Sequence, residues 1–221
     1  MLRVARRSAI KARTQAINAL RSVLVTAPPE LREQLGARST SRAVEMAARL
    51  RPALLGSPLA ASKLALRQLA RRCQTLEAEI TSLDRELAKL TAAASPRLIE
   101  AFGVGADTAG ALLVAVGDNP ERLRSEAAFS MLCGSSPIKA CSGKTNRHRL
   151  NRGGNRQANA ALYRIVLVRM RYHQPTRAYV VRRTSEGKSK REIIRCLKRY
   201  VAREVYTLLR QAGEQKLAGA A

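Results

Sequence analysis

The chain has 221 residues, of which 41 are Lys or Arg and 16 are Asp or Glu, so its formal net charge at pH 7 is +25. Self-repulsion at this charge destabilises a compact fold, and we therefore expect a polyanionic partner, most naturally the phosphate backbone of nucleic acid. The sequence has no run of roughly 20 apolar residues, which excludes a membrane-spanning helix. Aromatic residues are scarce, with no Trp, two Phe and five Tyr, which favours backbone contacts over base stacking.

The first 58 residues predict basic helices followed by a linker. Residues 3–25 form a helix in this interpretation, because the apolar residues that would share one face are correctly spaced, namely Ile10, Ile17, Leu20 and Leu24. Pro28 and Pro29 end that helix, since proline cannot continue its hydrogen-bond ladder. A short helix is expected near residues 31–35, and a looser stretch follows to Pro58.

Residues 59–94 predict one long helix with a coiled-coil seam. Apolar residues alternate spacings of three and four over about four heptads, at Leu66, Leu69, Cys73, Leu76, Ile80, Leu83, Leu87 and Leu90. Glu79 and Asp84 would repel one another in a parallel pair, which favours an antiparallel pair or packing on the first helix. We expect a spacer that forms homo-oligomers; the alternative is a single amphipathic helix packed within its own domain.

Residues 95–118 predict a helix–hairpin–helix at the start of a C-terminal domain that covers residues 95–210. Pro96 is typical of a first helical position, and a second helix is expected over 106–116 after a glycine-containing turn. Because glycine lets backbone N–H groups approach a phosphate at a helix N-terminus, Gly103 and Gly105 are candidate DNA- or RNA-contact residues. The alternative is that the hairpin packs inside the domain.

The following region is free of acidic residues. From Ala127 to Ser185 it carries twelve Lys or Arg and no Asp or Glu. Helices are expected over 125–133, 156–171 and 190–209, and a loop of small and cationic residues spans 134–156. Loops of this kind between rigid helices commonly carry binding and catalytic groups.

The expected fold class is therefore all-α: a helical, coiled-coil linker followed by a compact helical domain. Residues 211–221 are expected to form a flexible tail. The four cysteines show no familiar zinc spacing, and Cys133, Cys141 and His148 match none, so we expect reduced cysteines in a cytoplasmic protein and no metal bound by ligands of this chain.

The loop places one serine among many cations. The hydroxyl of Ser142 could attack a phosphodiester while the cations stabilise the charge that develops at phosphorus. His148 could move the proton, because imidazole titrates near neutral pH. The alternative, which composition alone favours, is that the loop only binds phosphate. The candidate contact residues are Lys139, Lys144, Arg147, His148, Arg149, Arg152, Asn155 and Arg156.

A set of short motifs extends from Pro96 to Arg171. The first has the form GxGxxTAxxLLxxxGD and comprises Gly103, Gly105, Thr108, Ala109, Leu112, Leu113, Gly117 and Asp118. The remainder comprises Cys133, Gly134, Pro137, Ser142, Gly143, Lys144, Arg152, Gly154, Asn155, Arg156 and Leu162. Together these motifs resemble the C-terminal transposase domain of the insertion-sequence 110 family, which includes the Piv-type invertases.

The resemblance implies a DNA transposase of an insertion sequence in a bacterial cytoplasm. Ser142 falls where that family carries its nucleophilic serine, which forms a covalent phosphoserine link to DNA. The family pairs this serine with an N-terminal nuclease-like domain whose four acidic residues bind Mg²⁺. Some of its members are guided by a structured RNA encoded by the element. Cys141 stands where the family often has a second small residue, and is the alternative nucleophile.

Nothing in the chain resembles the acidic domain of that family. The acids before Asp84 lie in helical or linker patterns and are Glu30, Glu33, Glu45, Glu77 and Glu79. We therefore expect the linker and C-terminal transposase domain only, which contribute Ser142 to a composite active site and lack strand-transfer activity alone. The alternative function is a non-catalytic nucleic-acid-binding coiled-coil module, which binds RNA or acts as partner or regulator of a full-length transposase.

Overall fold

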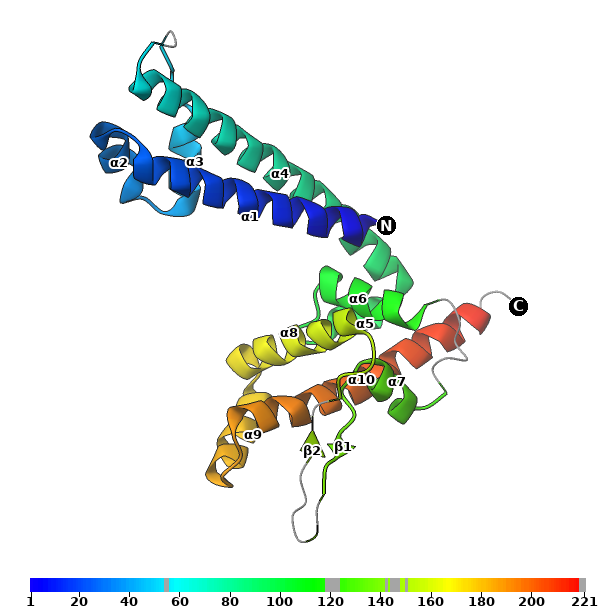
Figure 1. Cartoon of the computed structure of the whole chain (residues 1–221). Coiled ribbons are helices and arrows are strands. Elements are labelled where there is room, and N and C mark those ends of the chain that lie inside the picture. Colours follow the sequence, from blue (N-terminus) through cyan, green and yellow to red (C-terminus); the bar gives the residue numbers. More distant parts are fainter. Residues whose placement is uncertain (54–55, 118–123, 142, 144–147, 150, 219–221) are drawn as a thin grey trace. The chain divides into compact units, whose positions relative to one another are not determined.

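The structure, a computed structural model, describes residues 1–53, 56–117, 124–141, 143, 148–149 and 151–218. These residues form ten helices and one two-stranded sheet (Figure 1), which confirms the all-α fold class. None of the described helices combines the length and the apolar character that a membrane span needs. The chain divides into two units, residues 1–86 and 87–221, and each is described by itself. The domain limits expected from the sequence stay predictions.

The first unit consists of three helices and most of a fourth. Pro29 opens the second of them, and the side chain of Ser39 caps the third by accepting a hydrogen bond from the amide of Arg42. The bounds are α1 Leu2–Thr26, α2 Pro29–Gly36, α3 Thr40–Ala48 and α4 Pro58–Ala94. A small apolar core joins them, formed by Leu20, Ala27, Leu31, Leu35, Ala47, Ala48, Leu66 and Ala70.

Helix α4 packs antiparallel to α1 within this unit. The guanidinium of Arg6 donates to Asp84, with 3.3 Å between Nη2 and Oδ2, and Arg13 forms an ion pair with Glu77 further along both helices. In the first three heptads of the predicted seam, one position is buried (Leu66, Cys73, Ile80), and the other is half-buried (Leu69, Leu76, Leu83). The structure thus shows the packing on the first helix that the sequence left open, and homo-oligomerisation stays a prediction.

The second unit has its core where α6 and α8 pack on one another and α10 crosses α7 and α8. The largest fully buried side chains of this core include Leu98, Leu112, Phe129, Leu162, Ile165 and Ile193. Each such side chain contributes roughly 1.5–3 kcal/mol on burial. The bounds are α5 Pro96–Glu100, α6 Ala106–Val116, α7 Glu126–Leu132, β1 Ile138–Lys139, β2 His148–Arg149, α8 Arg156–Tyr172, α9 Gln174–Ser185 and α10 Lys190–Ala218.

Four elements were not predicted from the sequence. Helix α3 buries only alanines, Ala43, Ala47 and Ala48, and α9 buries only Thr176, so neither shows a strong apolar stripe. The strands β1 and β2 have two residues each, too few for an alternating pattern. Helix α10 also continues past the expected end at Leu209 to Ala218, through residues that are mostly good helix formers.

Candidate nucleic-acid interface

The predicted serine loop is a β-hairpin between α7 and α8 (Figure 1). Its two strands pair antiparallel, with Ile138 opposite Arg149 and Lys139 opposite His148. The predicted nucleophile Ser142 and the predicted contact residues Lys144 and Arg147 lie outside the described residues. The structure therefore defines the base of the hairpin, and the role of Ser142 stays a prediction.

Two glycines hold the ends of the hairpin together. Gly134 follows α7 and Gly154 precedes α8, with φ of 61° and 88°. A Cβ atom on Gly154 would lie 2.6 Å from the carbonyl oxygen of Leu132 and 2.8 Å from the amide nitrogen of Gly134. The amide of Asn155 donates to that same carbonyl at 2.6 Å. Only glycine permits this approach, which fixes the spacing of the two strands at their base.

Three asparagines complete the base of the hairpin. Asn151 accepts a hydrogen bond from the amide of Gly153 at 2.9 Å. Asn159, on α8, donates to the carbonyls of Cys133 and Gly134 at 2.8 and 3.0 Å. Asn155 caps α8, accepting from the amides of Gln157 and Ala158 at 2.9 and 3.1 Å. The structure thus gives Asn155 a capping role, and its predicted contact with nucleic acid stays a prediction.

The cations of the hairpin and of the turn that follows it are exposed. Lys139, Arg149, Arg152 and Arg156 are all exposed, and none makes an ion pair with a residue that the structure describes. Arg156 is also the first residue of α8, where the first turn carries no acid. A cation at a helix N-terminus is unfavourable, because that end of the helix dipole is already positive. An anion bound at this place would remove the penalty.

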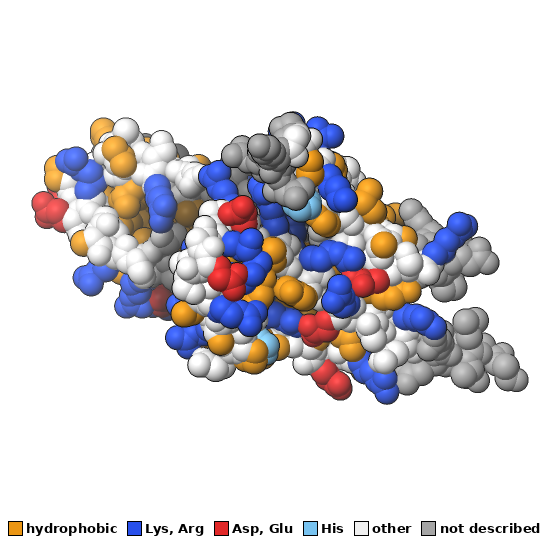
Figure 2. Space-filling model, turned by 90° about the horizontal axis from the view of Figure 1, so that it is seen from below, with side chains coloured by type: hydrophobic (Ala, Val, Ile, Leu, Met, Phe, Trp, Pro, Cys, Tyr) orange, Lys and Arg blue, Asp and Glu red, His pale blue; other side chains and the backbone are white. Residues whose placement is uncertain are grey.

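Several cations of the acid-free segment on α8 and α9 are instead paired. Arg164 donates to Asp107 at 2.6 Å. Arg169 forms two bonds with Glu204, at 2.6 and 2.8 Å. Arg183 forms an ion pair with Glu186. Seen from the side of the hairpin (Figure 2), Lys and Arg side chains are spread widely over the molecule, with few Asp and Glu among them.

The glycine turn before α6 packs against α8. Gly103 has φ of 80°, and a Cβ atom there would lie 3.3 Å from the carbonyl oxygen of Ile165. Arg169 reaches the same turn and donates to the carbonyl of Phe102 at 2.8 Å. Helix α6 is buried over most of its length. These contacts favour the packing alternative for Gly103.

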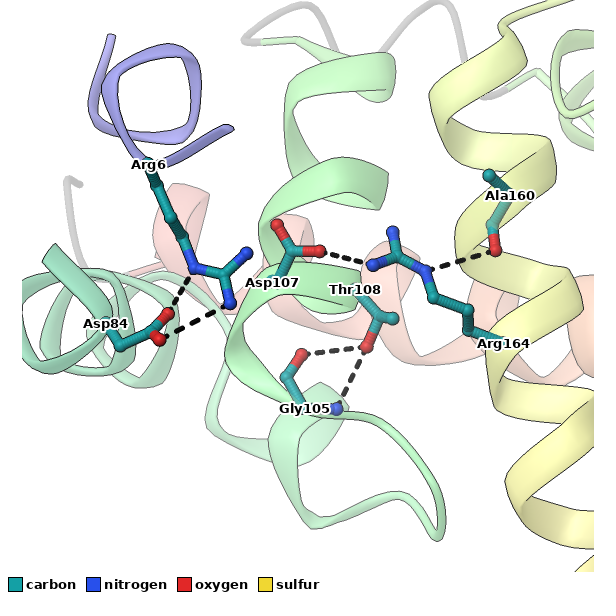
Figure 3. A network of polar contacts seen from close by, with 7 residues as sticks. All are labelled: Arg6, Asp84, Gly105, Asp107, Thr108, Ala160 and Arg164. Carbon is teal, nitrogen blue, oxygen red and sulfur yellow. Dashed lines mark hydrogen bonds and ion pairs between the residues drawn. The ribbon is translucent and has the colours of Figure 1, made fainter. Parts of the chain in front are cut away.

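Residues of the protein already make polar contacts with one another at the N-terminus of α6 (Figure 3). The amide of Gly105 donates to the hydroxyl of Thr108 at 2.9 Å, and this hydroxyl donates to the carbonyl of Gly105 at 2.8 Å. Asp107, in the first turn, holds Arg164. A carboxylate in the first turn already complements the positive end of the helix dipole. The contact of Gly103 and Gly105 with nucleic acid therefore stays a prediction with little support from this geometry.

A basic pocket lies between the base of the hairpin and α10. Its volume is about 740 Å³, and its cationic lining residues are Arg149, Lys188, Arg195, Lys198, Arg199 and Arg203. Arg199 and Arg203 share the carboxylate of Glu126, whereas Arg195 donates to the carbonyl of His148 at 3.5 Å. These α10 residues were not among the predicted contact residues. The spacing of four between Arg195, Arg199 and Arg203 was the signal, since it places them on one helical face.

Two ionisable groups beside this pocket have shifted pKa values. Burial raises the pKa of the Cys133 thiol to about 12, so this thiol is neutral at pH 7. Burial lowers the pKa of Lys198, whose ammonium donates to Oδ1 of Asn159 at 2.7 Å.

The predicted contact residue His148 is exposed on β2. The pocket and the hairpin base can accommodate a phosphate group.

The described residues do not form a site for Mg²⁺. No group of three His, Cys, Asp or Glu side chains among them is placed to hold a metal ion. Hard cations such as Mg²⁺ require carboxylate or other oxygen ligands. The residues that the structure describes therefore do not fit the ion that the resemblance implies.

Comparison with known proteins finds a family match within the second unit. Residues 95–181 match the family model described as Transposase IS116/IS110/IS902 family, whereas no curated protein matches the chain. The matched segment begins just before α5, contains the hairpin with Ser142, and ends within α9. It covers the motifs on which the resemblance rested. The match supports a transposase region of the IS116/IS110/IS902 family in the C-terminal part of this chain, as the sequence predicted.

Proposed function

We propose that the protein is a DNA-binding transposase component of an insertion sequence that contributes Ser142 as the nucleophile for strand cleavage and transfer. The observation that carries the proposal is the family match over residues 95–181, because it encloses the segment Ser142–Gly143–Lys144. The exposed cations of the hairpin base, with no counter-ions among the described residues, support it. They provide the positive surface that a phosphate backbone needs.

The proposed chemistry is a transesterification. The Ser142 hydroxyl attacks a backbone phosphorus, the bond from phosphorus to one sugar oxygen breaks, and a phosphoserine link and a free sugar hydroxyl result. The hydroxyl proton passes to a base, for which His148 is the proposed group. Arg149 and Arg152 stabilise the charge on the phosphoryl oxygens. The reverse attack by another sugar hydroxyl releases the serine and completes the transfer.

We further propose that the active site is composite. The described residues offer no group of carboxylates suited to a metal ion, and in this proposal a partner domain or protein supplies them. The chain alone then binds DNA but performs no strand transfer. The proposal extends to a structured guide RNA as a partner and to homo-oligomers formed through α4. The half-buried seam of α4 gives self-association only weak support.

Complementation tests the role of Ser142. An intact transposase of this family, whose own nucleophilic serine is replaced by alanine, is combined with this chain and with DNA that carries the ends of the element. Recombination is expected with the chain and with its Cys141→Ser variant, but not with Ser142→Ala. A protein–DNA adduct that survives Ser142→Ala and is lost with Cys141→Ser would assign the nucleophile to Cys141. Strand exchange by this chain without a partner would refute the composite site.

A non-catalytic binding module is the second candidate function. It is favoured by the lack of a carboxylate group among the described residues and by the helical first unit, which can serve as a spacer. In this case the chain binds DNA or RNA and regulates an intact transposase. Added to an active transposase, the chain and its Ser142→Ala variant would then change recombination equally, and neither would rescue the serine-deficient enzyme.

A further inference from the structure

The pocket between the hairpin base and α10 contains a buried cation without a counter-ion. Lys198 is 7% exposed and is nevertheless one of the residues that line the pocket. No carboxylate among the described residues forms an ion pair with its ammonium. The neighbouring Cys133 thiol does not supply a negative charge, because burial raises its pKa to about 12.

The hydrogen bonds of Lys198 are also incomplete. An ammonium has three N–H donors, and the described residues accept one, through Oδ1 of Asn159 at 2.7 Å. The orientation of the Asn159 amide is fixed, because its nitrogen donates to the carbonyls of Cys133 and Gly134. The same asparagine thus holds the hairpin base and fixes the ammonium. A buried charge with unused donors is costly unless a ligand of opposite charge completes it.

The remaining lining of the pocket specifies the charge of that ligand. Arg149 and Arg195 line it from the hairpin and from α10, and neither forms an ion pair with a described residue. Among the described lining residues the one carboxylate is Glu192, which accepts hydrogen bonds from the amide and the hydroxyl of Ser189 at 2.9 and 2.7 Å. These bonds, followed by the charges of Lys188 and Arg195, lower the pKa of Glu192. An anion with several acceptor oxygens satisfies all three cations, and a tetrahedral phosphate group has this chemistry.

We propose that this pocket binds one phosphodiester group of a nucleic-acid strand, with Lys198 as its deepest contact and Arg149 and Arg195 at its sides. The volume of about 740 Å³ is far larger than a bare phosphate and leaves room for the attached sugars. Because the pocket borders both ends of the hairpin, a strand anchored there runs past the hairpin base. The inference rests on the proposed binding of DNA and adds a residue that the family motifs do not contain.

The first experiment measures the affinity of the full chain for a fluorescein-labelled 20-base-pair duplex at several salt concentrations. Lys198→Met removes the buried charge, and Lys190→Met removes an exposed charge from the first turn of the same helix. We expect Lys198→Met to lose about tenfold in affinity and about 0.9 in the salt slope. Lys190→Met should lose at most about twofold. Equal losses in both variants would refute the pocket, whereas absence of salt-sensitive binding by the unmodified chain would refute the proposed function itself.

The second experiment does not require a variant, so it holds even if Lys198→Met fails to fold. The unmodified chain is treated with limiting acetic anhydride, and acetylation of each lysine is followed by mass spectrometry. Duplex DNA should protect Lys198 at least tenfold more than inorganic phosphate at the same phosphorus concentration. Equal protection by inorganic phosphate would mean that the pocket takes a free anion, and no protection by DNA would refute the inference.

Discussion

Two glycine-containing segments of the second unit were expected to contact phosphate: the turn before α6 and the hairpin after α7. They differ in how the cations beside them are paired. At the turn, Gly103 packs on α8, and Asp107 already holds Arg164 at the start of α6. At the hairpin, the glycines hold the base together, but Arg149 and Arg152 have no counter-ion among the described residues. Gly103 at the turn and Gly134 and Gly154 at the hairpin all serve packing.

This difference indicates that a phosphate-binding segment is recognised by cations without counter-ions and not by the presence of glycine. A glycine is required in both places because the backbones approach closely or φ is positive. What distinguishes the hairpin is that its described cations form no ion pair with any residue that the structure describes. Unneutralised cations destabilise a fold by mutual repulsion, and they are therefore informative about a partner. The predictions below test this contrast, from the largest expected effect to the smallest.

The largest effect is expected from Gly154→Ala. Its Cβ would lie 2.6 Å from the carbonyl oxygen of Leu132 at φ of 88°, and we expect a loss of about 3 kcal/mol or more in the free energy of unfolding. Gly105→Ala is the matched control, because a Cβ there meets nothing within 4 Å and should cost less than about 1 kcal/mol. Urea denaturation of both variants measures the loss in the free energy of unfolding. A similar cost for the two would mean that the hairpin base is not the rigid element described here.

A smaller effect is expected from Arg169→Met. This substitution removes the bonds to Glu204 and to the carbonyl of Phe102, and we expect a loss of about 2 kcal/mol in the free energy of unfolding. Arg149→Met removes the same charge from the exposed hairpin and should leave stability within about 0.5 kcal/mol. DNA affinity should follow the reverse order, falling more for Arg149→Met. Urea denaturation measures the stability of both variants, and titration with DNA measures their affinity. If Arg169 were the DNA contact, Arg169→Met would show the larger loss of affinity.

The smallest effect is a pH dependence of that same ion pair. The hydrogen bond from Arg169 lowers the pKa of the Glu204 carboxyl, so its stabilisation is complete above the usual pKa of Glu and is lost as pH falls through the lowered value. The stability difference between the unmodified chain and Arg169→Met should therefore shrink from pH 7 to pH 3. Because the Glu204 side chain is 43% exposed, the change should stay below about 1 kcal/mol. A difference that grows toward acid pH would contradict this sign.

Much of the fold could be predicted from the sequence, because long helices with bulky apolar stripes show a clear period. The heptads of α4 and the apolar residues of α6 and α8 are examples. Helix α9 could not be predicted in this way, since it buries only Thr176. At the candidate site, the hairpin residues were found from their composition. Lys198 and Asn159 were not, because a buried lysine in a helical pattern is distinguished from a solvent-exposed one only by its tertiary contacts.

The most direct test of the account compares two triple variants of equal charge by their DNA affinity at several salt concentrations. The hairpin variant carries Lys139→Gln, Arg149→Gln and Arg152→Gln, and the control carries Arg171→Gln, Arg177→Gln and Arg182→Gln, all exposed on α8 and α9. If the hairpin is the phosphate contact, its variant loses up to about 2.7 in the slope of log K against log salt concentration, whereas the control loses less than about 1. Equal losses in the two variants would contradict the account, because they would show that net charge alone, and not the hairpin, binds the DNA.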